Sequence, residues 1–320
     1  MFSPSLLNRF LRAAVVVWTG LSSAAWGAHL TDADYQRNFR ALRYPAAGTG
    51  DFLPYRLLRP YKFKAAKKYP LVLTLHGAGE RGTDNWAQVD ANYLAKIWAD
   101  STSQARFPCF VVAPQCPYNA RDSQWVNTAW TQTTYVRATV PISRPLAMAI
   151  AIVDSLVKAC PQIDTNRIYI AGLSMGGWGV WDAVTRFPEK FAAAVPMCGG
   201  GDTSEAGAIG ALAVWAAVGT LDSIIPPQAT RNMVAALERR SGAAVRTIGT
   251  VTWTNTTILT RQQFVRKVSA VPTPDIVFNE YSNAQHEVWE PLLDDTLLIP
   301  WVFSKIKILE TKGGRAIRTR

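Results

Sequence analysis

Histidine is scarce in this chain of 320 residues, which contains three histidines and four cysteines. The cysteines, at positions 109, 116, 160 and 198, do not follow the paired spacing of a zinc site. We therefore expect no metal site and no cofactor. Any chemistry that needs an imidazole has to use His29, His76 or His286.

Long hydrophobic runs are lacking after the N-terminal segment. Residues 1–27 begin with basic residues, continue through an apolar stretch and end in small residues, a pattern typical of a secretory signal peptide. An uncleaved anchor is the alternative. No later segment offers about 18 consecutive apolar residues. We therefore expect a secreted or periplasmic protein without stable membrane insertion after signal cleavage.

A nucleic-acid-binding pattern is also lacking, although the formal net charge is +11. Two arginines before residue 28 and four basic residues in the tail at 311–320 carry six of these charges, which leaves +5 for the body of the chain. Such a body has an ordinary solvated surface, so we expect no nucleic-acid partner. Residues 28–310 are enough for one catalytic-size domain with a full core.

Short apolar segments alternate with helical patterns along this body. The expected strands are 51–60, 70–75, 110–113, 168–171, 191–196, 212–218 and 275–281, and the expected helices are 91–98, 145–159, 175–187, 229–239 and 292–308. The alternation predicts an α/β fold whose mainly parallel sheet has helices on both faces. A long loop at 115–143 and a polar, lid-like insert at 241–271 interrupt it.

A G-x-S-x-G motif, Gly172–Gly176, lies between an expected strand and an expected helix. A serine on such a sharp turn presents an exposed hydroxyl, and the helix that follows directs N–H groups at an oxyanion. An ordinary glycine-rich loop is the alternative. The placement predicts that Ser174 is a nucleophile.

A serine nucleophile needs a base within hydrogen-bond distance. His29 lies near the predicted mature N-terminus, and His76 opens a His-Gly-Ala-Gly run suited to an oxyanion loop. His286 follows the last expected strand, so we predict that it is the base. Asp222 is the preferred acid to orient it, and Asp202 is the second choice.

Two backbone N–H groups are expected to bind an oxyanion. Met175 follows the nucleophile directly, and Ala78 lies in the run of small residues after an expected strand. Trp125, Trp130 and Trp289 are expected to bind substrate by stacking on a sugar or aromatic ring. Core packing is the alternative for each tryptophan.

Five motifs identify a family likeness: His76–Asn85, Ala113–Pro117, Gly172–Gly177, Arg186–Pro196 and Cys198–Asp202. With these motifs the chain resembles the α/β-hydrolase superfamily over nearly its whole mature length. More narrowly, it is similar to secreted esterases and predicted peptidases related to polyhydroxybutyrate depolymerases, feruloyl esterases and dienelactone hydrolases. The resemblance implies the α/β-hydrolase fold and a Ser174–Asp222–His286 triad.

Two features depart from the pattern of these relatives. The insert at 241–271 is longer than the usual link, and Gln285 stands where a glycine often precedes the histidine. The expected activity is that of a serine esterase acting on a small-molecule or polymer-linked carboxylic ester, with carbohydrate or phenolic esters favoured. The alternatives are a serine peptidase of the prolyl-oligopeptidase-like type and a non-catalytic binding protein on a hydrolase scaffold.

Overall fold

The computed structural model describes most of the chain between residues 38 and 318. The described residues are 38–310, apart from 47, 49, 211, 242–245, 248–250 and 253–275, together with 316–318. The expected signal peptide at 1–27, His29, most of the insert at 241–271 and most of the tail at 311–320 lie outside them.

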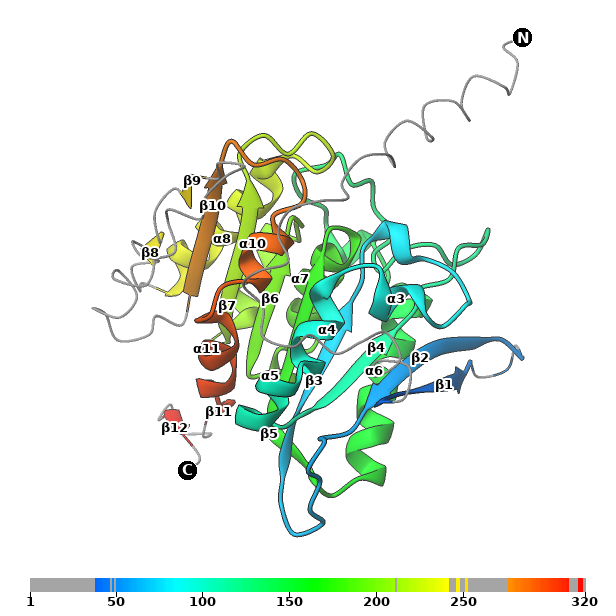
Figure 1. Ribbon diagram of the computed structural model, residues 1–320. Helices are drawn as coiled ribbons and strands as arrows, with labels where there is room; N and C mark the ends of the chain where they lie inside the picture. Colours follow the sequence, from blue (N-terminus) through cyan, green and yellow to red (C-terminus); the bar gives the residue numbers. More distant parts are fainter. Residues whose placement is uncertain are drawn as a thin grey trace, which may run out of the picture.

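One large twisted sheet runs through the protein (Figure 1). Its strands are β1 (Phe39–Pro45), β2 (Phe52–Leu58), β3 (Tyr69–Leu75), β4 (Phe110–Pro114), β5 (Ile163–Leu173), β6 (Ala193–Met197), β7 (Ala213–Gly219), β8 (Arg246–Thr247), β9 (Val251–Thr252) and β10 (Ile276–Ser282). They follow the order β1-β2-β4-β3-β5-β6-β7-β10-β8, and β9 also pairs with β10. β1 and β2 pair antiparallel with each other, β2 pairs antiparallel with β4, and the pairings among the remaining strands of this sheet are parallel.

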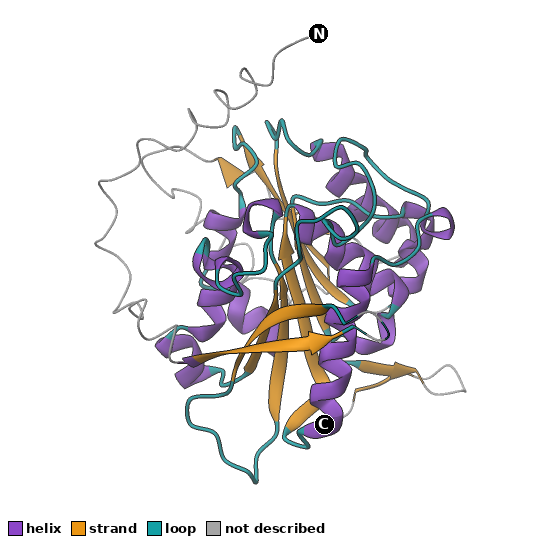
Figure 2. Ribbon diagram, turned by 90° about the vertical axis from the view of Figure 1, so that its right-hand side faces the viewer, coloured by secondary structure: helices purple, strands orange, loops and turns teal. Residues whose placement is uncertain are grey.

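Helices cover both faces of this sheet (Figure 2). The α-helices are α3 (Ala87–Asp90), α4 (Tyr93–Ala99), α5 (Ser101–Arg106), α6 (Arg144–Ala159), α7 (Met175–Arg186), α8 (Pro227–Ser241), α10 (Trp289–Leu293) and α11 (Leu298–Ser304). The short 3₁₀ helices are η1 (Ala78–Glu80), η2 (Arg137–Thr139), η3 (Pro188–Lys190) and η4 (Thr203–Ile209). A separate two-stranded sheet consists of β11 (Ile308–Glu310) and β12 (Ala316–Arg318), which pair antiparallel.

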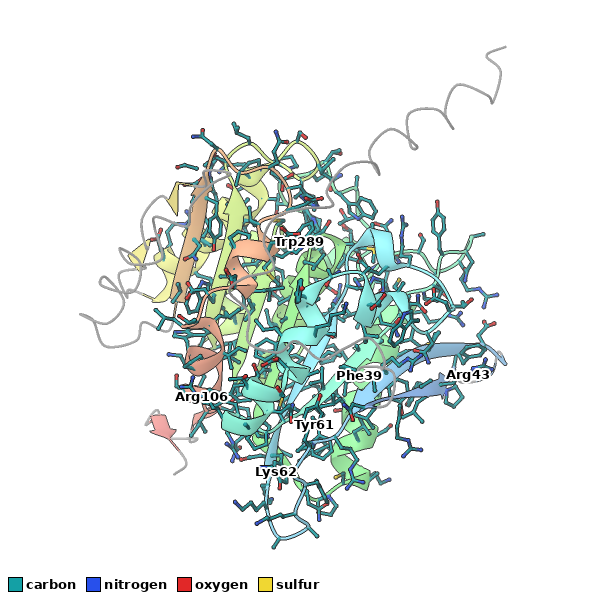
Figure 3. All side chains as sticks on the ribbon, viewed as in Figure 1. Phe39, Arg43, Tyr61, Lys62, Arg106 and Trp289 are labelled. Carbon is teal, nitrogen blue, oxygen red and sulfur yellow. The ribbon has the colours of Figure 1, made fainter. Side chains whose placement is uncertain are left out.

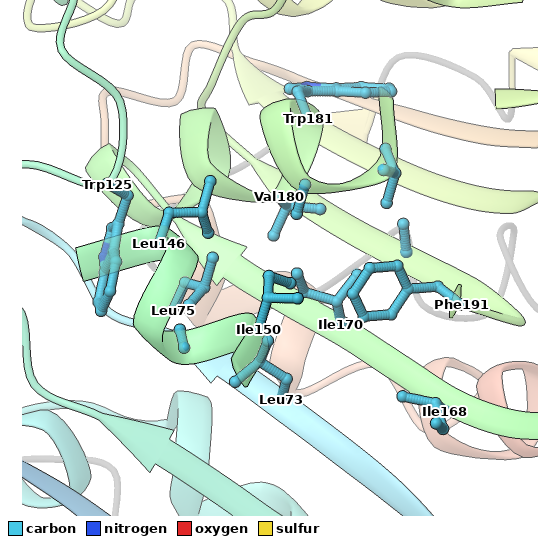
Figure 4. Close-up of a cluster of buried hydrophobic side chains, with 14 of the residues drawn as sticks. Leu73, Leu75, Trp125, Leu146, Ile150, Ile168, Ile170, Val180, Trp181 and Phe191 are labelled. Carbon is cyan, nitrogen blue, oxygen red and sulfur yellow. The ribbon is translucent and has the colours of Figure 1, made fainter. Parts of the chain in front are cut away.

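The central strands contribute side chains to two hydrophobic clusters, one on each face of the sheet, because successive side chains point to opposite faces. Leu71, Leu73 and Leu75 of β3 join the cluster that α6, α7 and α8 cover, whereas Val72 joins the cluster that α4, α10 and α11 cover. Figure 4 shows the first cluster, in which Val180 of α7 packs toward β3 and β5. Since both faces are buried, the central strands are nearly continuous apolar runs.

The α/β prediction is confirmed, and each expected strand and helix has a counterpart, although the last expected helix is interrupted and β1, α3 and α5 were not expected. The strand β1 was missed; it pairs with β2 and forms the outer edge of the sheet. In the described part of the expected insert at 241–271, β8 and β9 are two-residue strands that pair with β10. The single closing helix at 292–308 is wrong: α10 ends at Leu293, α11 begins at Leu298, and between them the Asp295 side chain accepts from the Leu297 N–H at 2.9 Å.

The long loop at 115–143 packs closely against the domain. Val126 and Tyr135 lie in a small apolar cluster with Trp178 of α7 and with Ile225 after β7. The Thr134 hydroxyl donates to the Gly201 carbonyl at 2.9 Å, which joins the loop to the segment after β6. The loop therefore forms a wall over the start of α7. Within the described ranges, no helix has the length and apolar character needed to span a bilayer.

Candidate active site

Ser174 lies on a sharp turn between β5 and α7. Its φ of 56° and ψ of −119° are unusual for a residue with a side chain, and its N–H donates to the Met197 carbonyl at 2.8 Å. A Cβ on Gly172 would lie 2.4 Å from the Gly176 carbonyl oxygen, so the turn closes only because Gly172 lacks a side chain. The strained backbone holds the Ser174 hydroxyl at the C-terminal edge of the sheet.

His286 follows β10 and reaches the same edge. Its Nε2 lies 2.8 Å from the Ser174 hydroxyl, and its Nδ1 lies 2.7 Å from Oδ2 of Asp222. An ionised carboxylate only accepts hydrogen bonds, so Nδ1 carries the proton and Nε2 accepts from the serine. This tautomer is the one in which His286 can take the Ser174 proton.

Asp222 is held by the turn that follows β7. Its Oδ1 accepts from the N–H groups of Ile224 and Ile225, both at 2.9 Å. The side chain is fully buried, which leaves Oδ2 directed at His286. The loop of His286 rests on the same turn, because the Leu221 N–H donates to the Ala284 carbonyl at 2.9 Å.

Asp202, the second choice for the acid, has other partners. Its carboxylate accepts from the Arg137 N–H at 2.7 Å and from the hydroxyl of Ser204 at 2.6 Å. Burial raises the pKa of Asp202, but the bonds from Ser204 and Arg137 outweigh burial and keep that pKa below its ordinary value. Asp202 thus fastens the 115–143 loop to the segment after β6, and the carboxylate that contacts His286 is that of Asp222.

His76 is buried within the loop that follows β3. Its Nε2 accepts from the Cys116 N–H at 2.8 Å, so Nδ1 carries the proton and donates to the Gly77 carbonyl at 2.6 Å. Burial lowers the pKa of His76 to about 4. A neutral, fully bonded imidazole orders this loop and is unsuited to act as the base at Ser174.

The two expected oxyanion donors lie on neighbouring segments. Met175 is the first residue of α7, where a helix leaves its N–H groups without partners inside the helix. Ala78 begins η1, and a Cβ on the preceding Gly77 would lie 2.7 Å from the Leu173 side chain, next to the serine turn. The loop of Ala78 therefore packs against the turn that carries Ser174.

Arg81 and Gln115 support this loop; both lie in motifs that carry the family resemblance, but neither was assigned a role from the sequence. Arg81 Nε donates to the Ala78 carbonyl at 2.8 Å. Gln115 is completely buried; its Nε2 donates to the Glu80 carbonyl at 3.0 Å, and its Oε1 accepts from the Asn85 N–H at 2.6 Å. A glutamine directly after an apolar strand that ends in proline was the available signal, since such a residue is positioned to bond the neighbouring loop.

The three expected substrate-binding tryptophans have different surroundings. Trp125 is completely buried beside Leu75 and Leu146, and its Nε1 donates to the His76 carbonyl at 3.0 Å (Figure 4). The expectation that Trp125 stacks on substrate is therefore wrong, because its ring supports the loop from inside the core. Trp130 is partly exposed, and the Arg81 guanidinium lies 5.5 Å from its ring centre.

Trp289 begins α10 and is also partly exposed (Figure 3). Its ring meets the His286 ring edge to face, with the ring centres 5.3 Å apart. This contact limits the rotation of the imidazole and leaves the indole next to the candidate site.

The chemistry of this donor set favours proton transfer over metal binding. Among the described residues, Cys198, Asp222 and His286 offer potential ligand atoms within 4.8 Å of one another. Both ring nitrogens of His286 and the Oδ2 of Asp222 already share hydrogen bonds. Burial raises the pKa of Cys198 well above its ordinary value, which opposes the thiolate that a metal requires. The four cysteines are all free thiols.

Comparison with known sequences gives two partial matches. The model of the prolyl oligopeptidase family matches residues 143–217, a segment that includes Ser174 and ends before Asp222 and His286. A poly(3-hydroxyalkanoate) depolymerase C from Paucimonas lemoignei is 31% identical over 131 residues, which are 41% of this chain and 28% of that protein.

Comparison with solved structures extends the likeness to most of the chain. A thermostable esterase superposes with a TM-score of 0.69 at 34% identity, covering 84% of this chain and 64% of that one. An acylaminoacyl peptidase from Pyrococcus horikoshii gives a TM-score of 0.54 at 12% identity, covering 87% and 43%. The second likeness concerns the fold alone. This chain spans less than two thirds of the length of each of these relatives.

Proposed function

The chain belongs to the α/β-hydrolase superfamily, within its group of esterases and peptidases, and we propose that it is a serine esterase that hydrolyses carboxylic esters through an acyl-enzyme. One observation carries the proposal: the unbroken line of hydrogen bonds from Ser174 through His286 to Asp222, at 2.8 and 2.7 Å, that begins on a strained turn. The similarity to a thermostable esterase supports the same reaction class.

In the first half of the proposed reaction, Ser174 Oγ attacks the ester carbonyl carbon while its proton passes to Nε2 of His286. The carbonyl oxygen becomes an oxyanion, which the N–H groups of Met175 and Ala78 would stabilise. Asp222 keeps the proton on Nδ1 and stabilises the imidazolium. The tetrahedral intermediate then collapses, and His286 returns its proton to the departing alkoxide.

In the second half, water replaces the alcohol. Nε2 of His286 takes a proton from this water, and the hydroxide attacks the acyl carbon in the same oxyanion site. Collapse of the second intermediate breaks the bond to Ser174 Oγ, which recovers the proton from His286. The products are one carboxylic acid and one alcohol, and the enzyme returns to its starting state.

The proposed substrates are small-molecule or polymer-linked esters of carbohydrates or phenols. Two partly exposed indoles support this choice: Trp289 lies against His286, and Trp130 lies on the 115–143 wall near Arg81. Flat indole faces stack on sugar and aromatic rings. The similarity to a depolymerase of poly(3-hydroxyalkanoate) supports an ester, including one held in a polymer.

A fluorophosphonate probe tests the catalytic claim directly. We expect the folded protein to be labelled once, at Ser174, and the Ser174→Ala variant to remain unlabelled. Mass spectrometry of the labelled peptide identifies the site. If Ser174 stays unlabelled in folded protein, the chain is a binding protein on a hydrolase scaffold, which is the remaining non-enzymatic alternative.

A serine peptidase is the second candidate, and the match of residues 143–217 to the prolyl oligopeptidase family favours it. The same triad can cleave an amide, so geometry at Ser174 does not separate the two. Parallel assays on p-nitrophenyl acetate, methyl ferulate and a peptide p-nitroanilide separate them. We expect kcat/KM to be higher for the esters, and preferential cleavage of the amide would assign the chain to the peptidases.

We also propose that the protein is exported, as the pattern at residues 1–27 suggests. Expression of the full sequence in a bacterium, followed by fractionation and mass spectrometry, tests this. We expect a mature chain that begins near Ala28 in the periplasm or medium. An uncut chain in the membrane fraction would instead support an anchor.

A further inference from the structure

Cys198 lies directly after β6, and its backbone has a conformation that residues with a side chain seldom adopt. Its φ is +49°, and its N–H donates to the Ala217 carbonyl of β7 at 2.9 Å. The side chain is completely buried. A non-glycine residue at positive φ costs free energy, so the surrounding contacts hold Cys198 in place against its backbone preference.

The Cys198 thiol reaches the loop of the candidate base. Its Sγ lies 3.0 Å from the carbonyl oxygen of His286, which also accepts from the Val288 N–H at 2.9 Å. In the sheet order β6-β7-β10, this contact extends from the end of β6 past β7 to the loop after β10. Gly219 at the end of β7 leaves room, since a Cβ there would lie 2.1 Å from the Gln285 carbonyl oxygen.

The thiol of Cys198 is a hydrogen-bond donor at neutral pH. Burial, followed by the charge of Asp222, raises its pKa well above the ordinary value, while the N–H groups of Val288 and Gly219 oppose this shift. A protonated thiol is a poor nucleophile, and the proposed reaction does not use it. Its proton is therefore available for the His286 carbonyl.

We propose that Cys198 is a positioning residue, whose thiol fixes the main chain of His286 so that Nε2 stays within hydrogen-bond distance of Ser174 Oγ. This inference rests on the proposed esterase function. Asp222 and Trp289 contact the ring of His286, whereas Cys198 contacts its backbone carbonyl. Loss of the backbone contact lets the whole loop shift, and small displacements of catalytic groups reduce turnover more than binding.

The test compares Cys198→Ala with Cys198→Ser, whose hydroxyl restores a donor. We expect Cys198→Ala to lower kcat about tenfold, with KM changed less than about twofold, and to slow fluorophosphonate labelling of Ser174 by a similar factor. Cys198→Ser should recover most of this loss. If Cys198→Ala does not fold, Cys198→Gly replaces it, because glycine removes the thiol and relieves the positive φ.

Cys109→Ala is the matched control, since it also removes a buried thiol, one that contacts Gln104 and Trp98 at the start of β4. We expect its kcat to equal that of the wild type. The inference is overturned if Cys198→Ala keeps full kcat, if folded Cys198→Ser is as impaired as Cys198→Ala, or if Cys109→Ala loses as much turnover. Failure of the esterase proposal is distinct, because the wild type would then not hydrolyse esters, whether or not Ser174 is labelled.

Discussion

The carbonyl oxygen of Leu75 lies in the space that a side chain on Gly176 would need: a Cβ there would be 1.8 Å from it. The first turn of α7 thus packs directly onto the end of β3, and neither backbone segment can move without disturbing the sheet. We expect Gly176→Ala to lower the free energy of unfolding by at least about 3 kcal/mol, because overpacking against main chain is hard to relieve. Urea titration followed by circular dichroism measures the loss.

Gly79→Ala is the control for this substitution. Nothing lies within 4 Å of a Cβ at Gly79, so the free energy of unfolding of Gly79→Ala should stay within about 0.5 kcal/mol of the wild-type value. A Gly176→Ala protein as stable as Gly79→Ala would contradict the close packing of α7 on β3.

Substitution of Asp222 and of Asp202, the two candidates for the acid, is expected to affect turnover differently. Asp222→Asn should lower kcat about 10³- to 10⁴-fold, because an amide reverses the tautomer preference of His286 while preserving the shape of the site. Asp202→Asn should change kcat less than about tenfold, since Asp202 bonds Arg137 and Ser204 instead of the base. Steady-state assays on one ester measure both, and a larger effect at Asp202 would exchange the two assignments.

The sequence indicated the elements of this fold well where a local pattern decides the structure. The central strands are nearly continuous apolar runs, and α7 carries helical spacing up to Phe187, so their existence follows from burial and periodicity. The scarcity of histidine reduced the choice of base to His286 by elimination. The structure adds the distances that join this residue to Ser174 and Asp222.

The predictions from sequence were wrong or incomplete where contacts between distant parts of the chain determine the structure. Trp125 lies in a loop, and a loop has no period that tells which side chains face inward, so its burial could not be deduced. The break between α10 and α11 lies at a short turn in which the Asp295 side chain accepts from the Leu297 N–H, a contact that helical spacing alone does not reveal. The contact between Cys198 and His286 involves residues 88 positions apart in the sequence, and no local sequence pattern predicts it.

The buried imidazole of His76 predicts a pH-dependent stability. Burial lowers its pKa to about 4 from 6.5, so between these values the unfolded chain binds a proton that the folded chain does not. Stability is therefore highest above pH 6.5 and declines as the pH falls toward 4. From this group alone, the free energy of unfolding should fall by about 3 kcal/mol between pH 7 and pH 4.

Urea titrations at several pH values in this range measure that decline. Other groups titrate as well, so the informative quantity is the difference between the wild type and His76→Gln, which has no proton to bind there. We expect the variant to be less stable at pH 7 and to show a flatter dependence down to pH 4. Equal slopes for the two proteins would contradict a neutral, buried His76.

The two tryptophans of the long loop are expected to have different roles, Trp130 in a contact with substrate and Trp125 in a contact within the core. Trp130 is partly exposed near Arg81, so Trp130→Ala should raise KM for methyl ferulate about 2- to 10-fold relative to KM for methyl butyrate, the value expected for a lost ring contact. Trp125 has no exposed surface, and Trp125→Phe removes its bond to the His76 carbonyl. We expect Trp125→Phe to lower the free energy of unfolding by about 1–3 kcal/mol and to leave the ratio of the two KM values unchanged. If Trp125→Phe raised KM for methyl ferulate alone and Trp130→Ala did not, the ring-binding surface would have to be assigned to the loop of His76 instead of to Trp130.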